Sequence, residues 1–241
     1  MSRKSILIAS DNQQAAEFLS SYFADTQSIP TIIRSKADLS ALSSCRPDVL
    51  FFQGDWVDQK MTSRLAQLKA GSGDLKSFAL GPVSMDGVPW DGVLDLPIDE
   101  KLVRKTLLGK MEFPERIKLM IVDDEVEIIE LLQDYFEVRT DPPFQIRTAL
   151  NGLEAFKLAE QDMPHCLILD IKMPVRTGVQ FYRDLIRSGH RVPTIIFIDS
   201  TSAEDILEIR KWGTPVFVEK GGPSSSMPDM LALVKKLVVF S

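Results

Sequence analysis

The stretch Cys166-Leu167-Ile168-Leu169-Asp170 is a short apolar run that ends in a carboxylate, and a loop with Pro174 and Gly178 follows it. The apolar run predicts a buried strand, and the proline and glycine predict a turn directly after it. Two other apolar runs end in charged residues: residues 119–122 precede Asp123-Asp124-Glu125, and residues 216–218 precede Glu219 and Lys220. Because each charged group follows its own strand, we expect these groups to meet at one rim of a sheet.

Such a group of carboxylates needs a counter-charge. Two like charges about 4 Å apart repel each other by roughly 4 kcal/mol at an effective dielectric constant near 20. Protons, a basic side chain or a metal ion must therefore compensate them. Ligands that are all oxygen and leave room for water and phosphate suit Mg²⁺. A carboxylate can also act as a covalent nucleophile and form an aspartyl phosphate, with Lys220 pairing a phosphoryl oxygen.

These motifs, in this order, resemble the receiver domain of two-component response regulators over about residues 115–241. The matching positions are residues 122–125, then Leu169-Asp170 with Met173-Pro174 and Gly178, then residues 217–220. The resemblance implies that Asp170 is the phosphoacceptor and a metal ligand. It implies that Asp124 binds Mg²⁺ directly, that Asp123 acts mostly through water, and that the Lys172 carbonyl is a further ligand. Lys220 would contact the phosphate.

The sequence departs from this family at the position of its conformational switch. Receivers usually carry a Thr or Ser at the end of the fourth strand. Counting back from Lys220 places Ile198 there, while a small change of register would bring Asp199 or Ser200 to the site. Ser200 and the aromatic Phe217 are therefore the switch candidates. Gly221-Gly222 follows Lys220 where many receivers have a proline, which predicts a more flexible loop.

The chain reads as a repeat in which strands alternate with helices in each half, a pattern that predicts parallel sheets covered on both faces. We expect two tandem flavodoxin-like (βα)5 domains, each with a five-stranded parallel sheet, over residues 1–112 and 113–241. The expected strands of the first half are 6–9, 31–34, 48–52, 77–80 and 92–95, and its expected helices are 14–23 and 100–111. The expected strands of the second half are 117–122, 145–148, 166–170, 194–198 and 216–219, and its expected helices are 127–136, 153–161, 179–187, 203–211 and 230–238.

The first half lacks the chemistry of the second. Ser10 and Asp11 stand where the second half has two acids, Gln53 replaces the nucleophile, and Leu96 replaces the lysine. We interpret residues 1–112 as a pseudo-receiver that lacks the phosphorylation residues. The alternative is another flavodoxin-like module, and either would bind protein or dimerise.

Composition narrows the classes of function. The 241 residues carry a net charge of −6 with a pI of about 5.1, which argues against non-specific nucleic-acid binding. No apolar run approaches the roughly 20 residues that span a bilayer, and the start of the chain does not resemble a signal peptide. Two distant cysteines favour a reduced, cytoplasmic setting.

The sequence therefore predicts a response regulator without a DNA-binding or enzymatic output domain. A histidine kinase or a histidine phosphotransfer protein would phosphorylate Asp170 with Mg²⁺. Output would pass to an unknown downstream protein by direct contact, and a homodimer through one receiver-like domain stays an open alternative. A non-phosphorylated scaffold is the first rival. An aspartate-nucleophile phosphatase is a weaker rival, because Lys172 stands where such enzymes need a second acid.

Overall fold

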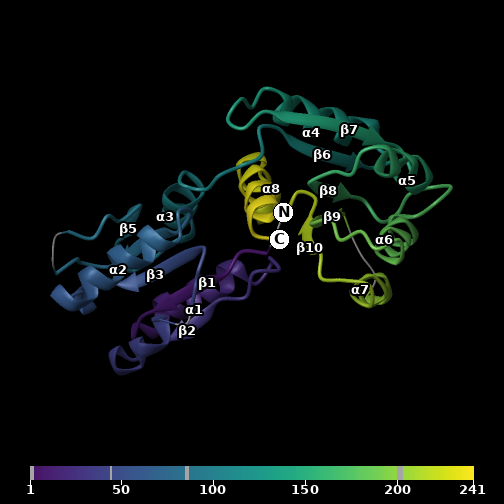
Figure 1. Cartoon of the computed structure of the whole chain (residues 1–241). Coiled ribbons are helices and arrows are strands. Elements are labelled where there is room, and N and C mark those ends of the chain that lie inside the picture. The colour runs from purple at the N-terminus through teal and green to yellow at the C-terminus, as the bar shows by residue number, and fades with distance from the viewer. Residues whose placement is uncertain (1–2, 44, 85–86, 200–202) are drawn as a thin grey trace. The chain divides into compact units, whose positions relative to one another are not determined.

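A computed structural model describes residues 3–43, 45–84, 87–199 and 203–241. The chain forms two compact units. The first consists of Met1–Glu112 with Val239–Ser241, and the second consists of Phe113–Val238. Each unit contains one five-stranded parallel sheet (Figure 1). The strand orders are β2-β1-β3-β4-β5 and β10-β9-β8-β6-β7, so both sheets follow the flavodoxin-like order 2-1-3-4-5. This confirms the predicted fold class.

The second unit has the alternating strands and helices of a (βα)5 domain. Its strands are β6 (Ile117–Val122), β7 (Phe144–Ala149), β8 (Cys166–Leu169), β9 (Thr194–Ile198) and β10 (Val216–Glu219). Its helices are α4 (Val126–Glu137), α5 (Gly152–Gln161), α6 (Gly178–Arg187), α7 (Ala203–Arg210) and α8 (Met227–Phe240), with a short 3-10 turn at Pro223–Ser225. The expected elements of this half lie within a few residues of these bounds.

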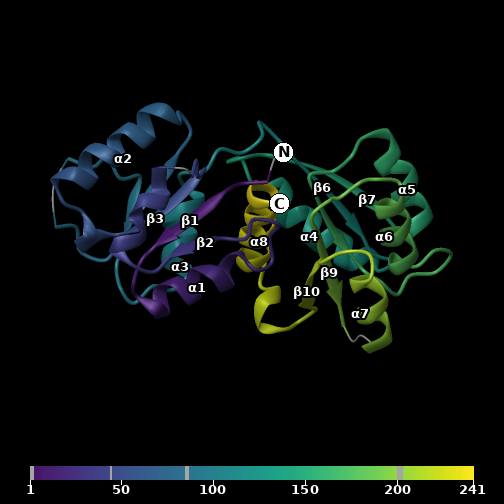
Figure 2. The same ribbon diagram turned by 60° about the horizontal axis from the view of Figure 1, so that its bottom comes forward.

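Both faces of the second sheet are covered. Successive residues of β6 alternate between two apolar clusters, Leu119 and Ile121 facing one and Met120 and Val122 the other. Helices α4 and α8 supply the first cluster, and α5 and α6 supply the second, with α7 adding Ile209. Figure 2 shows α4 and α8 on one side of this sheet and α5 and α6 on the other. Burial on both faces explains why these strands show no simple apolar–polar alternation.

The register of the second sheet places the charged strand ends together. Val122 of β6 pairs with Leu169 of β8, so the next residues, Asp123 and Asp170, leave neighbouring strands at the same level. Strand order reverses at these two strands, because β7 lies beyond β6 while β9 and β10 lie beyond β8. Ligands of open α/β sheets bind at such a point, outside the carboxyl ends of the strands.

The first unit has the same sheet but fewer helices. Its strands are β1 (Ile6–Ala9), β2 (Thr31–Ile33), β3 (Val49–Gln53), β4 (Lys76–Leu80) and β5 (Gly92–Leu94). Its helices are α1 (Gln13–Phe23), α2 (Gln59–Gly71) and α3 (Glu100–Val103), which continues as a π-helical stretch over Arg104–Leu108, and 3-10 segments cover Lys36–Ser43 and Gly54–Trp56. Among residues 81–84 and 87–91, between β4 and β5, no helix is present.

The division into units differs from the predicted boundaries at the end of the chain. Residues 239–241 were expected in the second domain, but they belong to the first compact unit. The reason is burial: the Phe240 ring lies 5.0 Å from the ring of Phe23 in α1, and the Phe240 carbonyl accepts a hydrogen bond of 2.7 Å from the Ser28 hydroxyl. In the described part of the chain, no helix is long and apolar enough to cross a bilayer.

Candidate phosphorylation site

Two buried carboxylates stand at the switch point of the second sheet. Asp123 is 2 % exposed and Asp170 is 6 % exposed. The Asp123 amide donates to the Ala149 carbonyl at the end of β7, and the Asp170 amide donates to the Val122 carbonyl at the end of β6. These backbone bonds extend the ladder by one residue and hold both acids at the rim.

Lys220 is the counter-charge of this pair. Its side chain is 7 % exposed, and its Nζ lies 2.9 Å from Asp123 Oδ2 and 3.7 Å from Asp170 Oδ1. The backbone amide of Lys220 donates to the Ile198 carbonyl at the end of β9, so the neighbouring strand fixes where the lysine leaves the sheet. The structure thus brings together three residues that the sequence placed on three different strands.

The titration of the site reflects this crowding. Burial raises the pKa of the Asp170 carboxyl, and the nearby Asp123 charge raises it further against the opposing effect of Lys220. Burial also raises the pKa of Asp123, although the hydrogen bond from Lys220 opposes the shift. Burial alone would lower the pKa of Lys220, but its carboxylate partners Glu125 and Asp123 reverse this and raise it. The site is therefore short of positive charge and suited to a further cation.

The remaining predicted ligands lie around the pair. Asp124 is exposed, and its charge contributes to the raised pKa of Asp170. The Lys172 backbone amide donates to Asp170 Oδ2 at 2.7 Å, which brings this residue next to the carboxylate. Within the residues that the structure describes, no three His, Cys, Asp or Glu side chains converge as a metal-binding group. Two carboxylates completed by water and phosphate are nevertheless a usual Mg²⁺ site, so the donor set fits this ion.

The loop after Asp170 is tightly built. Gly178 begins α6 against the end of β8, where a Cβ atom would lie 2.0 Å from the Asp170 carbonyl oxygen. Val175 adopts a φ of 67°, which is unusual for a β-branched residue, and is 81 % exposed. The Arg176 amide donates to the Pro174 carbonyl at 2.7 Å, which closes a three-residue turn around Val175.

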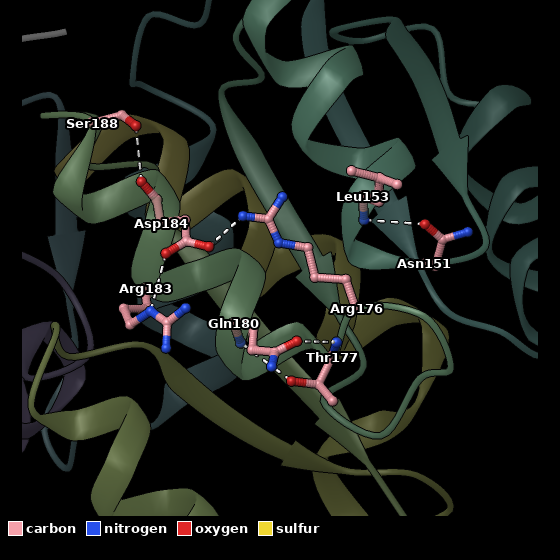
Figure 3. Close-up of polar contacts among 8 residues, drawn as sticks. All are labelled: Asn151, Leu153, Arg176, Thr177, Gln180, Arg183, Asp184 and Ser188. Carbon is pink, nitrogen blue, oxygen red and sulfur yellow. Dashed lines mark hydrogen bonds and ion pairs between the residues drawn. The ribbon is translucent and has the colours of Figure 1, made fainter.

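Polar contacts anchor this loop to α6, as Figure 3 shows, and a backbone hydrogen bond anchors it to α5. Arg176 reaches the Asp184 carboxylate, which also accepts a 3.0 Å hydrogen bond from Arg183 Nε. Thr177 caps α6 in a reciprocal capping box with Gln180. The Arg176 carbonyl accepts from the Gly152 amide, and Asn151 Oδ1 caps the start of the same helix α5. The strained turn is therefore held by contacts on both sides.

We expect Val175→Asn to stabilise the second unit by about 1 kcal/mol. A left-handed backbone conformation costs a β-branched L-residue roughly 1–2 kcal/mol of conformational free energy, and asparagine tolerates this conformation better. Little burial is lost, because the valine is largely exposed. Denaturant unfolding measures the gain. Val138→Asn is the matched control, since Val138 is 67 % exposed but has a φ of −76°. Equal effects of the two substitutions would contradict the strain at Val175.

The candidate residues for the conformational switch differ in their surroundings. Ile198 is buried at the end of β9 and pairs with Glu219, so the position counted back from Lys220 carries no hydroxyl. Ser200 lies outside the described residues. Phe217 is half-buried against the apolar cluster of α5 and α6, and the Arg210 guanidinium lies 5.6 Å from its ring centroid.

The first unit carries a neutral version of the same rim. The Ser10 amide donates to the Ile33 carbonyl at the end of β2, as the Asp123 amide does to β7. The buried Ser10 hydroxyl donates to Gln53 Oε1 at 2.5 Å, so one neutral hydrogen bond replaces the crowded carboxylates. Asp11 is exposed and Leu96 is half-buried. These positions cannot reproduce the charge balance of Asp123, Asp170 and Lys220.

Known proteins resemble the second half of the chain. The family described as "Response regulator receiver domain" matches residues 119–232. "Response regulator SaeR" of Staphylococcus aureus (strain USA300) is 30 % identical over 102 residues, 42 % of this chain and 43 % of the relative, so the chain matches less than half of that protein's length. Chemotaxis protein CheY4 of Vibrio cholerae aligns with a TM-score of 0.44 and 23 % identity over 51 % of this chain and 98 % of that one. The receiver domain of Francisella response regulator 1452 aligns with a TM-score of 0.45 and 23 % identity over 51 % of this chain and 96 % of that one.

The sheet order and the buried acids at the carboxyl ends of its strands define the second unit as a flavodoxin-like domain with an acidic rim. Residues 119–232 belong to the response regulator receiver domain family. The chain thus carries a response regulator receiver domain over these residues, preceded by a unit whose sheet has the same strand order.

Proposed function

We propose that Asp170 accepts a phosphoryl group from a phosphohistidine, and that the chain passes the signal on by protein–protein contact. The observation that carries this proposal is the pair of buried carboxylates, Asp123 and Asp170, which face the buried ammonium of Lys220. A purely structural site would be less costly with neutral groups, as in the Ser10–Gln53 pair of the first unit.

Each residue has a defined part in this reaction. The Asp170 carboxylate attacks phosphorus, the donor's N–P bond breaks, and its electron pair leaves with the imidazole nitrogen. Lys220 lies near Asp170 Oδ1 and would pair a phosphoryl oxygen. Asp123, Asp124, Asp170 and the Lys172 carbonyl would hold Mg²⁺, which neutralises charge on the transferring group.

The first unit serves as a protein-binding or dimerising module in this proposal, because a neutral Ser10–Gln53 pair stands where the second unit has its buried carboxylates. The donor would be a histidine kinase or a phosphotransfer protein, in the cytoplasm, and the downstream partner would be a protein rather than nucleic acid or membrane. We propose no enzymatic turnover, since Lys172 stands two residues after Asp170, where a phosphatase would need a proton-donating acid.

Intact mass after incubation with acetyl phosphate, with and without Mg²⁺, tests the proposal. We expect one Mg²⁺-dependent phosphoryl adduct that Asp170→Asn abolishes. Asp134→Asn is the matched control, because Asp134 is an exposed acid of α4. Absence of any adduct, together with no response to beryllofluoride, would favour the non-phosphorylated scaffold.

A further inference from the structure

Lys220 has a third acidic partner that the proposed reaction does not use. Glu125 Oε1 lies 2.8 Å from Lys220 Nζ, as close as Asp123 and closer than Asp170 at 3.7 Å. The two residues are 95 positions apart in the sequence. In the resting protein the lysine is therefore held mainly by Asp123 and Glu125, and only loosely by the phosphoacceptor.

The backbone fixes Glu125 in this place. Glu125 is the N-cap residue of α4, and its amide donates to Asp123 Oδ1 at 3.1 Å. Its side chain makes no capping bond to the helix and extends to Lys220 instead. The Glu125 side chain is 52 % exposed, whereas that of Lys220 is 7 % exposed. The contact thus links a half-exposed acid to the buried ammonium, and it can open without unpacking the core.

Phosphorylation changes what Lys220 must bind. The phosphoryl group brings negative charge to Asp170, and that charge needs the ammonium more than the resting carboxylate did. An ammonium has three hydrogens to donate, of which Glu125 and Asp123 now occupy two. The half-exposed Glu125 charge beside Lys220 also repels an anionic phosphodonor.

We propose that Glu125 is a positioning residue that holds Lys220 away from Asp170 and competes with the incoming phosphoryl group for its ammonium. This inference rests on the proposed function, since it assigns a control element to the same site. Glu125 does not touch the reacting atoms, and it acts only through Lys220. Its removal should therefore speed phosphorylation rather than prevent it.

The test compares Glu125→Gln, Glu125→Asp and Glu127→Gln in the full chain, with acetyl phosphate and saturating Mg²⁺. Glu127 is the matched control, because it is an exposed acid in the first turn of the same helix. We expect Glu125→Gln to raise the rate constant of phosphorylation about threefold to tenfold, the size of one charge contact at a partly exposed site. Glu125→Asp should behave similarly, because its shorter side chain keeps the charge but loses the reach.

A second readout needs no phosphorylation. The ¹⁵Nζ resonance of Lys220, identified by its loss in Lys220→Arg, should shift in Glu125→Gln and stay in place in Glu127→Gln. A Glu125→Gln rate equal to that of Glu127→Gln would overturn the inference. A phosphorylation rate equal to the native rate in Glu125→Asp would also overturn the inference, because the negative charge at position 125, rather than its contact with Lys220, would then set the rate. If no variant accepts phosphate, the proposed function fails, and the Lys220 resonance still decides whether the contact exists.

Discussion

Phe240→Ala should destabilise the first unit by about 3–5 kcal/mol, the usual cost of removing a buried phenylalanine. The Phe240 side chain is fully buried, with its ring 5.0 Å from that of Phe23. Phe23 in turn lies 6.0 Å from Phe51 of β3, so the last residues of the chain belong to the aromatic core under the first sheet. The substitution would leave a cavity at the edge of that core.

Hydrogen exchange followed by mass spectrometry measures this effect separately in each unit. Peptides covering β1 and β3 should exchange at least about a hundredfold faster in Phe240→Ala, while β6 and β8 keep their protection. Phe136→Ala is the matched control, because Phe136 is fully buried in α4 and its ring lies 5.0 Å from that of Phe144. It should show the opposite pattern. Unchanged exchange of β1 and β3 in Phe240→Ala would contradict the assignment of residues 239–241 to the first unit.

The sheets could be predicted from sequence because their strands are short apolar runs with charged or turn-forming ends. Helix α2 was missed for a physical reason. Of its 13 residues only Met61 and Leu65 are buried, so it lacks the repeated apolar positions that reveal an amphipathic helix. The packing partner of the end of α8 could not be predicted, because an apolar sequence such as Val238-Val239-Phe240 indicates that residues are buried but not against which residues they pack.

The site could be predicted as far as backbone topology determines it. Carboxyl ends of parallel strands share an edge, so the meeting of Asp123, Asp170 and Lys220 follows from the order of the strands. The reach of Glu125 to Lys220 depends on side-chain direction at the start of α4, which no local pattern encodes. The left-handed turn at Val175 was equally hidden, because a valine at that position gives no signal for positive φ.

Gly178→Ala should both destabilise the second unit and disturb phosphoryl acceptance. The added Cβ would lie 2.0 Å from the Asp170 carbonyl oxygen and 2.8 Å from the Ile171 Cα. Both neighbours are backbone atoms, so no side chain can rotate to relieve the clash, and the strand end that carries Asp170 must move. Overpacking of this kind typically costs about 1–3 kcal/mol and here should reach the upper end or exceed it.

Denaturant unfolding and the acetyl phosphate assay together separate this prediction from a general effect of replacing glycine. Gly73→Ala is the control, because a Cβ at Gly73 would meet no atom within 4 Å. It should leave both stability and phosphorylation within error of the native chain. If Gly178→Ala has the stability of the native chain and accepts phosphate at the native rate, the result would contradict the close contact between α6 and the end of β8. A loss of phosphorylation greater than the loss of folded protein would show that Gly178 holds the proposed phosphoacceptor in place, because the position of Asp170 then matters beyond the stability of the unit that carries it.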